Sequence, residues 1–138
     1  MKYLSCCNRL NNYQTGILEI RVMDNRNMPM LNAKISISKI SYTGIYNEGA
    51  EGVILAEFYT DNNGIIQIEL PVLNELMNRN DFYSAKISME GYYDVYIYYI
   101  QIYPDINSLY DVYLTQRTRD AERFMLIFQP KRRTVHDH

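Results

Sequence analysis

Few residues of this 138-residue chain are of the types that carry catalysis. Its two histidines, His136 and His138, stand at the C-terminal end, and its two cysteines, Cys6 and Cys7, are adjacent near the start. A Ser-His-Asp triad or a Cys–His pair needs these side chains within hydrogen-bond reach of one another. Between Cys7 and His136 the sequence has serines and aspartates but neither histidine nor cysteine. We therefore expect that the chain is not an enzyme.

Metal and cofactor sites are not expected either. Adjacent cysteines such as Cys6 and Cys7 rarely bond to each other because the bridge is strained, and two thiols alone do not complete a tetrahedral zinc site. The stretch 61–64, Asp-Asn-Asn-Gly, is a hairpin turn signal rather than a calcium loop, which needs twelve residues ending in a bidentate Glu. Glu48 and Glu51 lie in a Gly-rich stretch and are interpreted as solvated. No catalytic, metal or cofactor-binding residue is predicted.

Tyrosine is the residue type that stands out, with 14 copies against no tryptophan. Six of the tyrosines lie on or beside one predicted strand, residues 92–103, which is apolar on both faces. One face of that strand must enter the core, and the other carries Tyr96 and Tyr98. Two interpretations remain open: these rings pack against a neighbouring segment, or they form a partner surface, since exposed tyrosines favour protein interfaces and stack on sugars.

Charge is distributed unevenly. Residues 1–115 contain 8 Lys and Arg against 13 Asp and Glu, whereas residues 116–138 contain 6 against 3. The overall balance of −2 gives no chain-wide footprint for nucleic acid. The basic C-terminal part is interpreted either as a solvated run or as a region for partner docking or proteolytic cleavage. Its candidate residues are Arg117, Lys131, Arg132 and Arg133.

The elements that must position these residues are β-strands, because apolar and polar residues alternate with a period of two. The predicted strands are 17–24, 33–40, 53–60, 65–70, 82–89, 92–103 and 109–114. Seven strands at short spacing predict an all-β fold, a seven-stranded antiparallel β-sandwich. We expect Ile54 to point inward, a long loop at 41–52, and a helical turn or irregular crossover at 72–81.

The predicted organisation is a flexible leader at 1–14, one sandwich domain at 15–115, and a connector or tail at 116–138. Within the tail, residues 119–128 fit either a last helical turn or an added strand. No apolar run reaches the length of a membrane helix, and no signal-peptide pattern is visible. The expected location is cytoplasmic or spore-associated, with no membrane partner.

Four stretches, residues 22–33, 60–64, 83–92 and 109–114, resemble the carboxypeptidase-regulatory-like domain family. Their common features are a polar turn before Pro and Ala, a Thr-Asp-x-x-Gly hairpin, a strand ending in Gly-Tyr, and a closing strand. The resemblance implies a transthyretin-like sandwich over residues 16–115. The family often has Gly where Asn27 and Asn32 stand, and Asn can adopt the same left-handed backbone.

A narrower resemblance points to the N-terminal pro-domain of bacterial spore-cortex-lytic enzymes. It implies a non-catalytic accessory or pro-domain that contacts a protein partner or a downstream catalytic domain, with a role in sporulation or germination. The tyrosine strand and the basic tail would make the contact. The alternative function is a free-standing module that binds carbohydrate, such as a cell-wall glycan, through Tyr96 and Tyr98.

Overall fold

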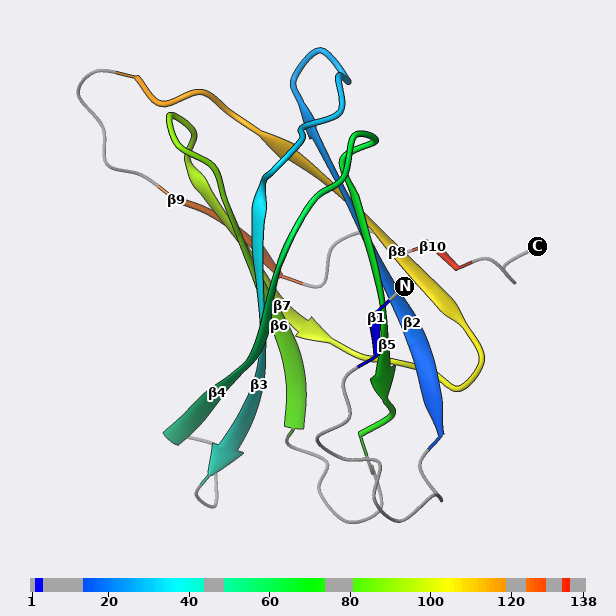
Figure 1. Cartoon of the computed structure of the whole chain (residues 1–138). Helices are drawn as coiled ribbons and strands as arrows, with labels where there is room; N and C mark the ends of the chain where they lie inside the picture. Colours follow the sequence, from blue (N-terminus) through cyan, green and yellow to red (C-terminus); the bar gives the residue numbers. More distant parts are fainter. Residues whose placement is uncertain are drawn as a thin grey trace.

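Ten β-strands and no helix make up the described part of the chain (Figure 1). The computed structural model describes residues 2–3, 14–43, 49–73, 81–118, 124–128 and 133–134. No helix in these ranges has the length and apolar character needed to cross a membrane. The strands are β1 (Lys2–Tyr3), β2 (Thr15–Asp24), β3 (Lys34–Thr43), β4 (Gly49–Tyr59), β5 (Ile65–Pro71), β6 (Asp81–Ser88), β7 (Asp94–Ile100), β8 (Asn107–Leu114), β9 (Phe124–Phe128) and β10 (Arg133–Thr134).

The strands form two facing sheets, with the orders β1-β5-β2-β8-β10 and β4-β3-β6-β7-β9 (Figure 1). The seven long strands β2–β8 correspond to the seven predicted ones, and the all-β sandwich is confirmed. The predicted antiparallel arrangement is wrong for three pairs, because β2–β8, β1–β5 and β7–β9 are parallel. The chain enters β8 by crossing from the other sheet rather than through a hairpin, and alternation in sequence carries no information about the direction of such a partner.

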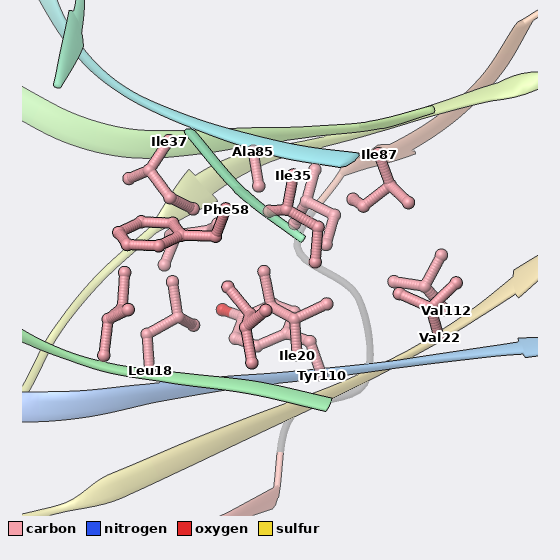
Figure 2. Packing of buried hydrophobic residues seen from close by; sticks show 14 of the residues in the cluster. Leu18, Ile20, Val22, Ile35, Ile37, Phe58, Ala85, Ile87, Tyr110 and Val112 are labelled. Atoms are coloured by element: carbon pink, nitrogen blue, oxygen red, sulfur yellow. The ribbon is translucent and has the colours of Figure 1, made fainter. Parts of the chain in front are cut away.

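The core lies between the sheets and is built mainly from alternate residues of the long strands, with Phe58 as the buried core residue of β4 (Figure 2). Period two predicts one inward set of alternate apolar residues in each of the strands 17–24, 33–40, 65–70, 82–89 and 109–114, and these five sets are buried as predicted. Fully buried examples are Leu18, Ile20, Val22, Ile35, Ile37, Ile68, Leu70, Ile87 and Leu114. Each side chain of this size contributes about 1.5–3 kcal/mol when it leaves water.

A β-bulge corrects the prediction for the third strand. The register between β3 and β4 shifts after Ile37, so that Ala56 lies opposite Ile37 while Ile54 lies opposite Ser38. Leu55 is the extra residue, and beyond it the faces of β4 are exchanged. Ile54, predicted to point inward, is 66% exposed. The predicted long loop at 41–52 is also wrong in part, since β3 continues to residue 43 and β4 begins at residue 49.

Asparagine and glycine set the tight turns. Asn27 and Asn32 have φ of 64° and 65°, the left-handed conformation expected at those positions. In the β4–β5 hairpin the Asp61 Oδ1 accepts hydrogen bonds from the amides of Asn63 and Ile65, at 2.9 and 3.0 Å. Gly64 follows with φ of 74°, and a side chain there would meet the Val22 carbonyl oxygen at 2.4 Å. The Gly64 carbonyl oxygen also accepts the Val22 amide at 2.7 Å, so this turn packs directly on β2.

Segments near both ends of the chain add to the sheets. β1 pairs with β5, β9 with β7, and β10 with β8. For residues 119–128, the added-strand alternative applies to 124–128, so the sheets extend into the segment predicted as a connector. The rest of the predicted leader, with Cys6 and Cys7, and most of the predicted crossover at 72–81 lie outside the described residues.

Candidate binding face on the β4-β3-β6-β7 sheet

One row of side chains crosses four neighbouring strands on the outer face of the second sheet. Ser36 of β3 lies opposite Glu57 of β4 on one side and opposite Lys86 of β6 on the other. Lys86 in turn lies opposite Tyr96 of β7. Because residues directly opposite each other share a face of the sheet, an acid, a hydroxyl, an amine and an aromatic ring stand side by side.

Around this row the sheet face is hollowed into a groove of about 430 Å³. Its walls are made mainly by small hydroxyl side chains on β3 and β6, flanked by longer residues on β4 and β7. The lining residues are Lys34, Ser36, Ser38, Ile40, Gly52, Ile54, Glu57, Ser84, Ala85, Lys86, Ser88, Tyr96 and Tyr98. We call this region the serine–tyrosine groove.

Tyr96 and Tyr98 form one side of the groove. Their rings are stacked with centroids 6.1 Å apart and an interplanar angle of 6°. The Lys86 ammonium nitrogen lies 5.8 Å from the Tyr96 ring centroid, in reach of a cation–π interaction. The inward residues of β7 are Val95 and Ile97, so period two places both tyrosines on the outer face, where they are half-buried. Tyr96 therefore both packs against Lys86 of β6 and lines the groove, so the two interpretations of this ring are compatible.

A second bulge ends this tyrosine platform. Between β6 and β7 the register shifts after Tyr83, which lies opposite Ile100, while Ala85 lies opposite Ile97. Tyr99 in this stretch has φ of 62°, and its ring packs edge-to-face on Phe82 at 5.2 Å. The bulge lets Ile100 re-enter the core without turning Tyr98 inward.

Two ion pairs neutralise the charges in and beside the groove. The Lys34 amine lies 3.2 Å from the Glu57 carboxylate, and the Ser36 hydroxyl donates to the same carboxylate oxygen at 3.1 Å. The hydrogen bond from Lys34, followed by that from Ser36, lowers the pKa of Glu57 below its ordinary value. Lys86 lies 3.8 Å from a carboxylate oxygen of Asp94. The face therefore offers hydroxyls and rings with balanced charge.

The outer face of the other sheet differs because several of its long polar side chains bond to one another. Glu19 accepts hydrogen bonds from the side-chain amides of Gln67 and Asn107, both at 3.1 Å. Arg21 donates to Asp111 across the parallel β2–β8 pair at 2.9 Å, and this hydrogen bond raises the pKa of Arg21. The serine–tyrosine groove combines a concavity with two stacked aromatic rings, and we take it as the candidate site.

Of the predicted tail residues, the structure describes the side chain of Arg117 alone. Its backbone amide donates to the Gly91 carbonyl at 2.8 Å, and its exposed side chain borders a hollow of about 410 Å³ at one end of the sandwich. That hollow shares Lys34 and Ser88 with the groove. The backbone of Arg133 lies in β10, whereas Lys131, Arg132 and the Arg133 side chain are outside the described residues.

Sequence reasoning identified Tyr96 and Tyr98 but not the residues beside them. The missed set comprises Lys34, Ser36, Ser38, Glu57, Ser84, Lys86 and Ser88. The outward positions of β3 and β6 are almost all Ser or Lys, a pattern that the sequence contains. The strand register that brings these positions together cannot be read from the sequence. Among the described residues no three His, Cys, Asp or Glu side chains gather as metal ligands would.

Comparison with known proteins shows structural similarity but no match at the level of sequence. No family model and no curated protein matches the chain. Wild-type catechol 1,2-dioxygenase from Acinetobacter radioresistens is similar at a TM-score of 0.51 and 11% identity, covering 91% of this chain and 61% of that one. Hydroxyquinol 1,2-dioxygenase from Pseudomonas putida DLL-E4 is similar at 0.51 and 11%, covering 84% and 60%. The C-terminal domain of shaft pilin SpaA from Lactobacillus rhamnosus GG gives 0.47 and 14%, covering 75% and 99%.

These neighbours overturn the expectation that the chain is not an enzyme. That expectation rested on the absence of histidine and cysteine between Cys7 and His136, whereas the solved structures that are similar in fold include 1,2-dioxygenases. The chain spans about three fifths of their length, and at 11% identity the likeness is one of fold, which assigns no reaction. The chain shares its sandwich with these enzymes.

Proposed function

We propose that this chain is a binding module that contacts a partner protein through the serine–tyrosine groove. The observation that carries the proposal is the stacked Tyr96–Tyr98 pair beside a concavity of about 430 Å³. Tyrosine is enriched at protein interfaces because a rigid ring supplies contact area and its hydroxyl supplies a hydrogen bond. An accessory or pro-domain contact with a spore-cortex or cell-wall hydrolase is the specific form of this function that the sequence resemblance suggests.

The electrostatics of the groove favour a partner surface that is polar but close to neutral. Lys34 with Glu57 and Lys86 with Asp94 each pair a cation with an anion on this face. Burying an already paired charge avoids leaving an uncompensated ion, which is the costly event at an interface. Ser36 and Ser38 add small hydroxyl groups that can donate and accept hydrogen bonds.

A carbohydrate chain is the second candidate for the same groove. The observation that favours it is the row of serine hydroxyls beside two stacked, nearly parallel rings, since the C–H face of a sugar stacks on an aromatic ring while its hydroxyls form hydrogen bonds. The two candidates share residues and differ in the ligand. The same groove variants therefore distinguish the two candidates, according to whether they lose binding to a protein or to a saccharide.

Site-specific photo-crosslinking tests the protein contact. A benzoylphenylalanine in place of Ser38, inside the groove, should form adducts with one defined protein in extracts of the source cells. The same probe in place of Gln67, on the outer face of the other sheet, serves as the control position. The purified partner should then bind the double variant Tyr96→Ala/Tyr98→Ala at least tenfold more weakly, since each interface ring contributes about 1–2 kcal/mol.

Tyr113→Ala is the matched control, because Tyr113 is 49% exposed on the other sheet. It should bind like the parent. Equal adducts from both probe positions, or equal binding by the double variant and the control, would refute the proposal. Retention of the parent on insoluble cell-wall glycan, with loss in the double variant alone, would replace the protein partner by a saccharide.

A further inference from the structure

The outer edges of the two sheets differ in whether a short added strand covers them. In the first sheet, the long outer strands β5 and β8 are covered by β1 and β10. In the second sheet, β9 covers β7 at one end. At the other end β4 (Gly49–Tyr59) pairs with β3 and has no second partner among the described residues, and Figure 1 shows it at the margin of its sheet. β4 is also the longest of the described strands, with 11 residues.

Apart from the bulge at Leu55, β4 has few of the devices that usually protect an edge. Edge strands are normally short or carry Lys or Pro, because a row of unpaired backbone amides and carbonyls is a template for another strand. The β4 sequence, GAEGVILAEFY, contains neither residue. Val53 and Ile54 are 61% and 66% exposed although successive residues point to opposite faces. An added strand would therefore find apolar neighbours on both faces.

The charges of β4 indicate which chain fits. Glu51 and Glu57 are both exposed, and the strand carries no cation. Glu57 is paired with Lys34, whereas Glu51 has no ion pair within the described part of the chain. Residues 1–115 as a whole are acidic, with 8 Lys and Arg against 13 Asp and Glu. The complementary segment is cationic.

A second copy of this chain fits less well. β4 carries two acids and no cation, so a second copy that paired through the same strand would add two more carboxylates and supply no cation to Glu51. A heterologous segment with Lys or Arg gains that attraction.

We propose that β4 is an acceptor edge to which an extended, cationic peptide segment of a partner adds as a further strand. Backbone hydrogen bonds would supply the affinity, Val53 and Ile54 would contact its apolar side chains, and Glu51 would pair with a Lys or Arg. The edge adjoins the serine–tyrosine groove, which Ile54 also lines, but the proposal does not depend on the function proposed there.

Binding of a synthetic peptide to the full chain tests the proposal. The probe is acetyl-Lys-Val-Lys-Thr-Lys-Val-Lys-Thr-amide, and the opposite-charge peptide has Glu in place of Lys. Amide NMR shifts should concentrate on residues 49–59, and the Glu peptide should bind at least tenfold more weakly. Two further peptides are N-methylated at every Lys, or at every Val and Thr. Strand addition requires that at least one of them lose tenfold or more in affinity, because one set of alternate amides faces β4.

Ile54→Lys should weaken binding of the Lys peptide about tenfold. Leu31→Lys, at a turn residue that is 47% exposed, is the control with the same charge change and should have little effect. Should Ile54→Lys fail to fold by urea denaturation, Glu51→Gln provides the second variant and should weaken binding several-fold. The Tyr96→Ala/Tyr98→Ala variant should bind this peptide like the parent, which separates the edge from the groove.

Four results would overturn the proposal. They are absence of shifts on residues 49–59 at millimolar peptide, equal binding by all N-methylated forms, equal loss with Leu31→Lys, and a dimer in sedimentation whose interface is β4. The last result would make a second copy the occupant.

Discussion

Replacing Gly64 with alanine should destabilise the sandwich strongly, for two separable reasons. Gly64 has φ of 74°, where an L-residue costs about 1–2 kcal/mol. A Cβ there would also lie 2.4 Å from the Val22 carbonyl oxygen, and that oxygen accepts the Met30 amide at 3.0 Å. Relieving the clash must move buried backbone, which at the scale of overpacking costs about 1–3 kcal/mol more. The expected loss for Gly64→Ala is about 2–5 kcal/mol.

Two other glycines isolate the two causes. Gly91 has φ of 87°, but no atom lies within 4 Å of the place that an alanine methyl group would take, so Gly91→Ala should cost about 1–2 kcal/mol from conformation alone. Gly16 lacks a left-handed φ, but a Cβ there would lie 2.1 Å from the Tyr103 carbonyl oxygen. Gly16→Ala should therefore cost about 1–3 kcal/mol from the clash alone.

Urea unfolding followed by far-UV circular dichroism measures all three variants against the parent. Each free energy comes from the midpoint and slope of the transition. The order of loss should place Gly64→Ala above both controls, with its loss close to their sum. A Gly64→Ala variant as stable as Gly91→Ala would show that the backbone around Val22 yields freely, and the clash argument would then be wrong.

Two further predictions concern hydrogen bonds. Thr60 is 2% exposed, and its hydroxyl donates to the Met30 carbonyl at 2.5 Å and accepts the Ala33 amide at 2.9 Å. Thr60→Val keeps the shape but leaves both backbone groups unsatisfied, so urea unfolding should show a loss of about 2–4 kcal/mol, with Thr60→Ser close to the parent. Lys34 and Ser36 lower the pKa of Glu57 in the folded chain. The ionised Glu57 carboxylate therefore stabilises the fold above its unfolded pKa, and this stabilisation is lost as the pH falls through the folded pKa. Side-chain NMR titration should show this low pKa, and Lys34→Met should raise it.

The sequence predicted the features of this fold that depend on local chemistry. Alternation placed Leu18, Ile20 and Val22 inward because period two assigns alternate residues to opposite faces. The turn at 61–64 and the left-handed Asn27 and Asn32 followed from the conformational preferences of their residue types. None of these predictions requires knowledge of a partner strand.

The features it missed depend on pairing across the chain. Nothing near Leu55 announces a bulge, because the bulge arises from the register of β4 against β3. The parallel pairing of β2 with β8 joins segments about 90 residues apart, and it is this pairing that brings Arg21 beside Asp111. The groove was predicted only in part for the same reason. Tyr96 could be identified from the sequence, whereas Lys86 is placed beside it by the strand register alone.

The outer faces of the two sheets differ in how their polar side chains are arranged. On the β5-β2-β8 face, long polar side chains such as Glu19 and Gln67 bond to one another, which stabilises the strands and leaves few groups for a ligand. On the β4-β3-β6-β7 face, serines occupy several outward positions of β3 and β6, and the face is hollowed between Glu57 on one side and Tyr96 and Tyr98 on the other. The edge strand β4 belongs to the same sheet. A single partner that covers the groove would therefore also lie close to the edge, because Ile54 belongs to both.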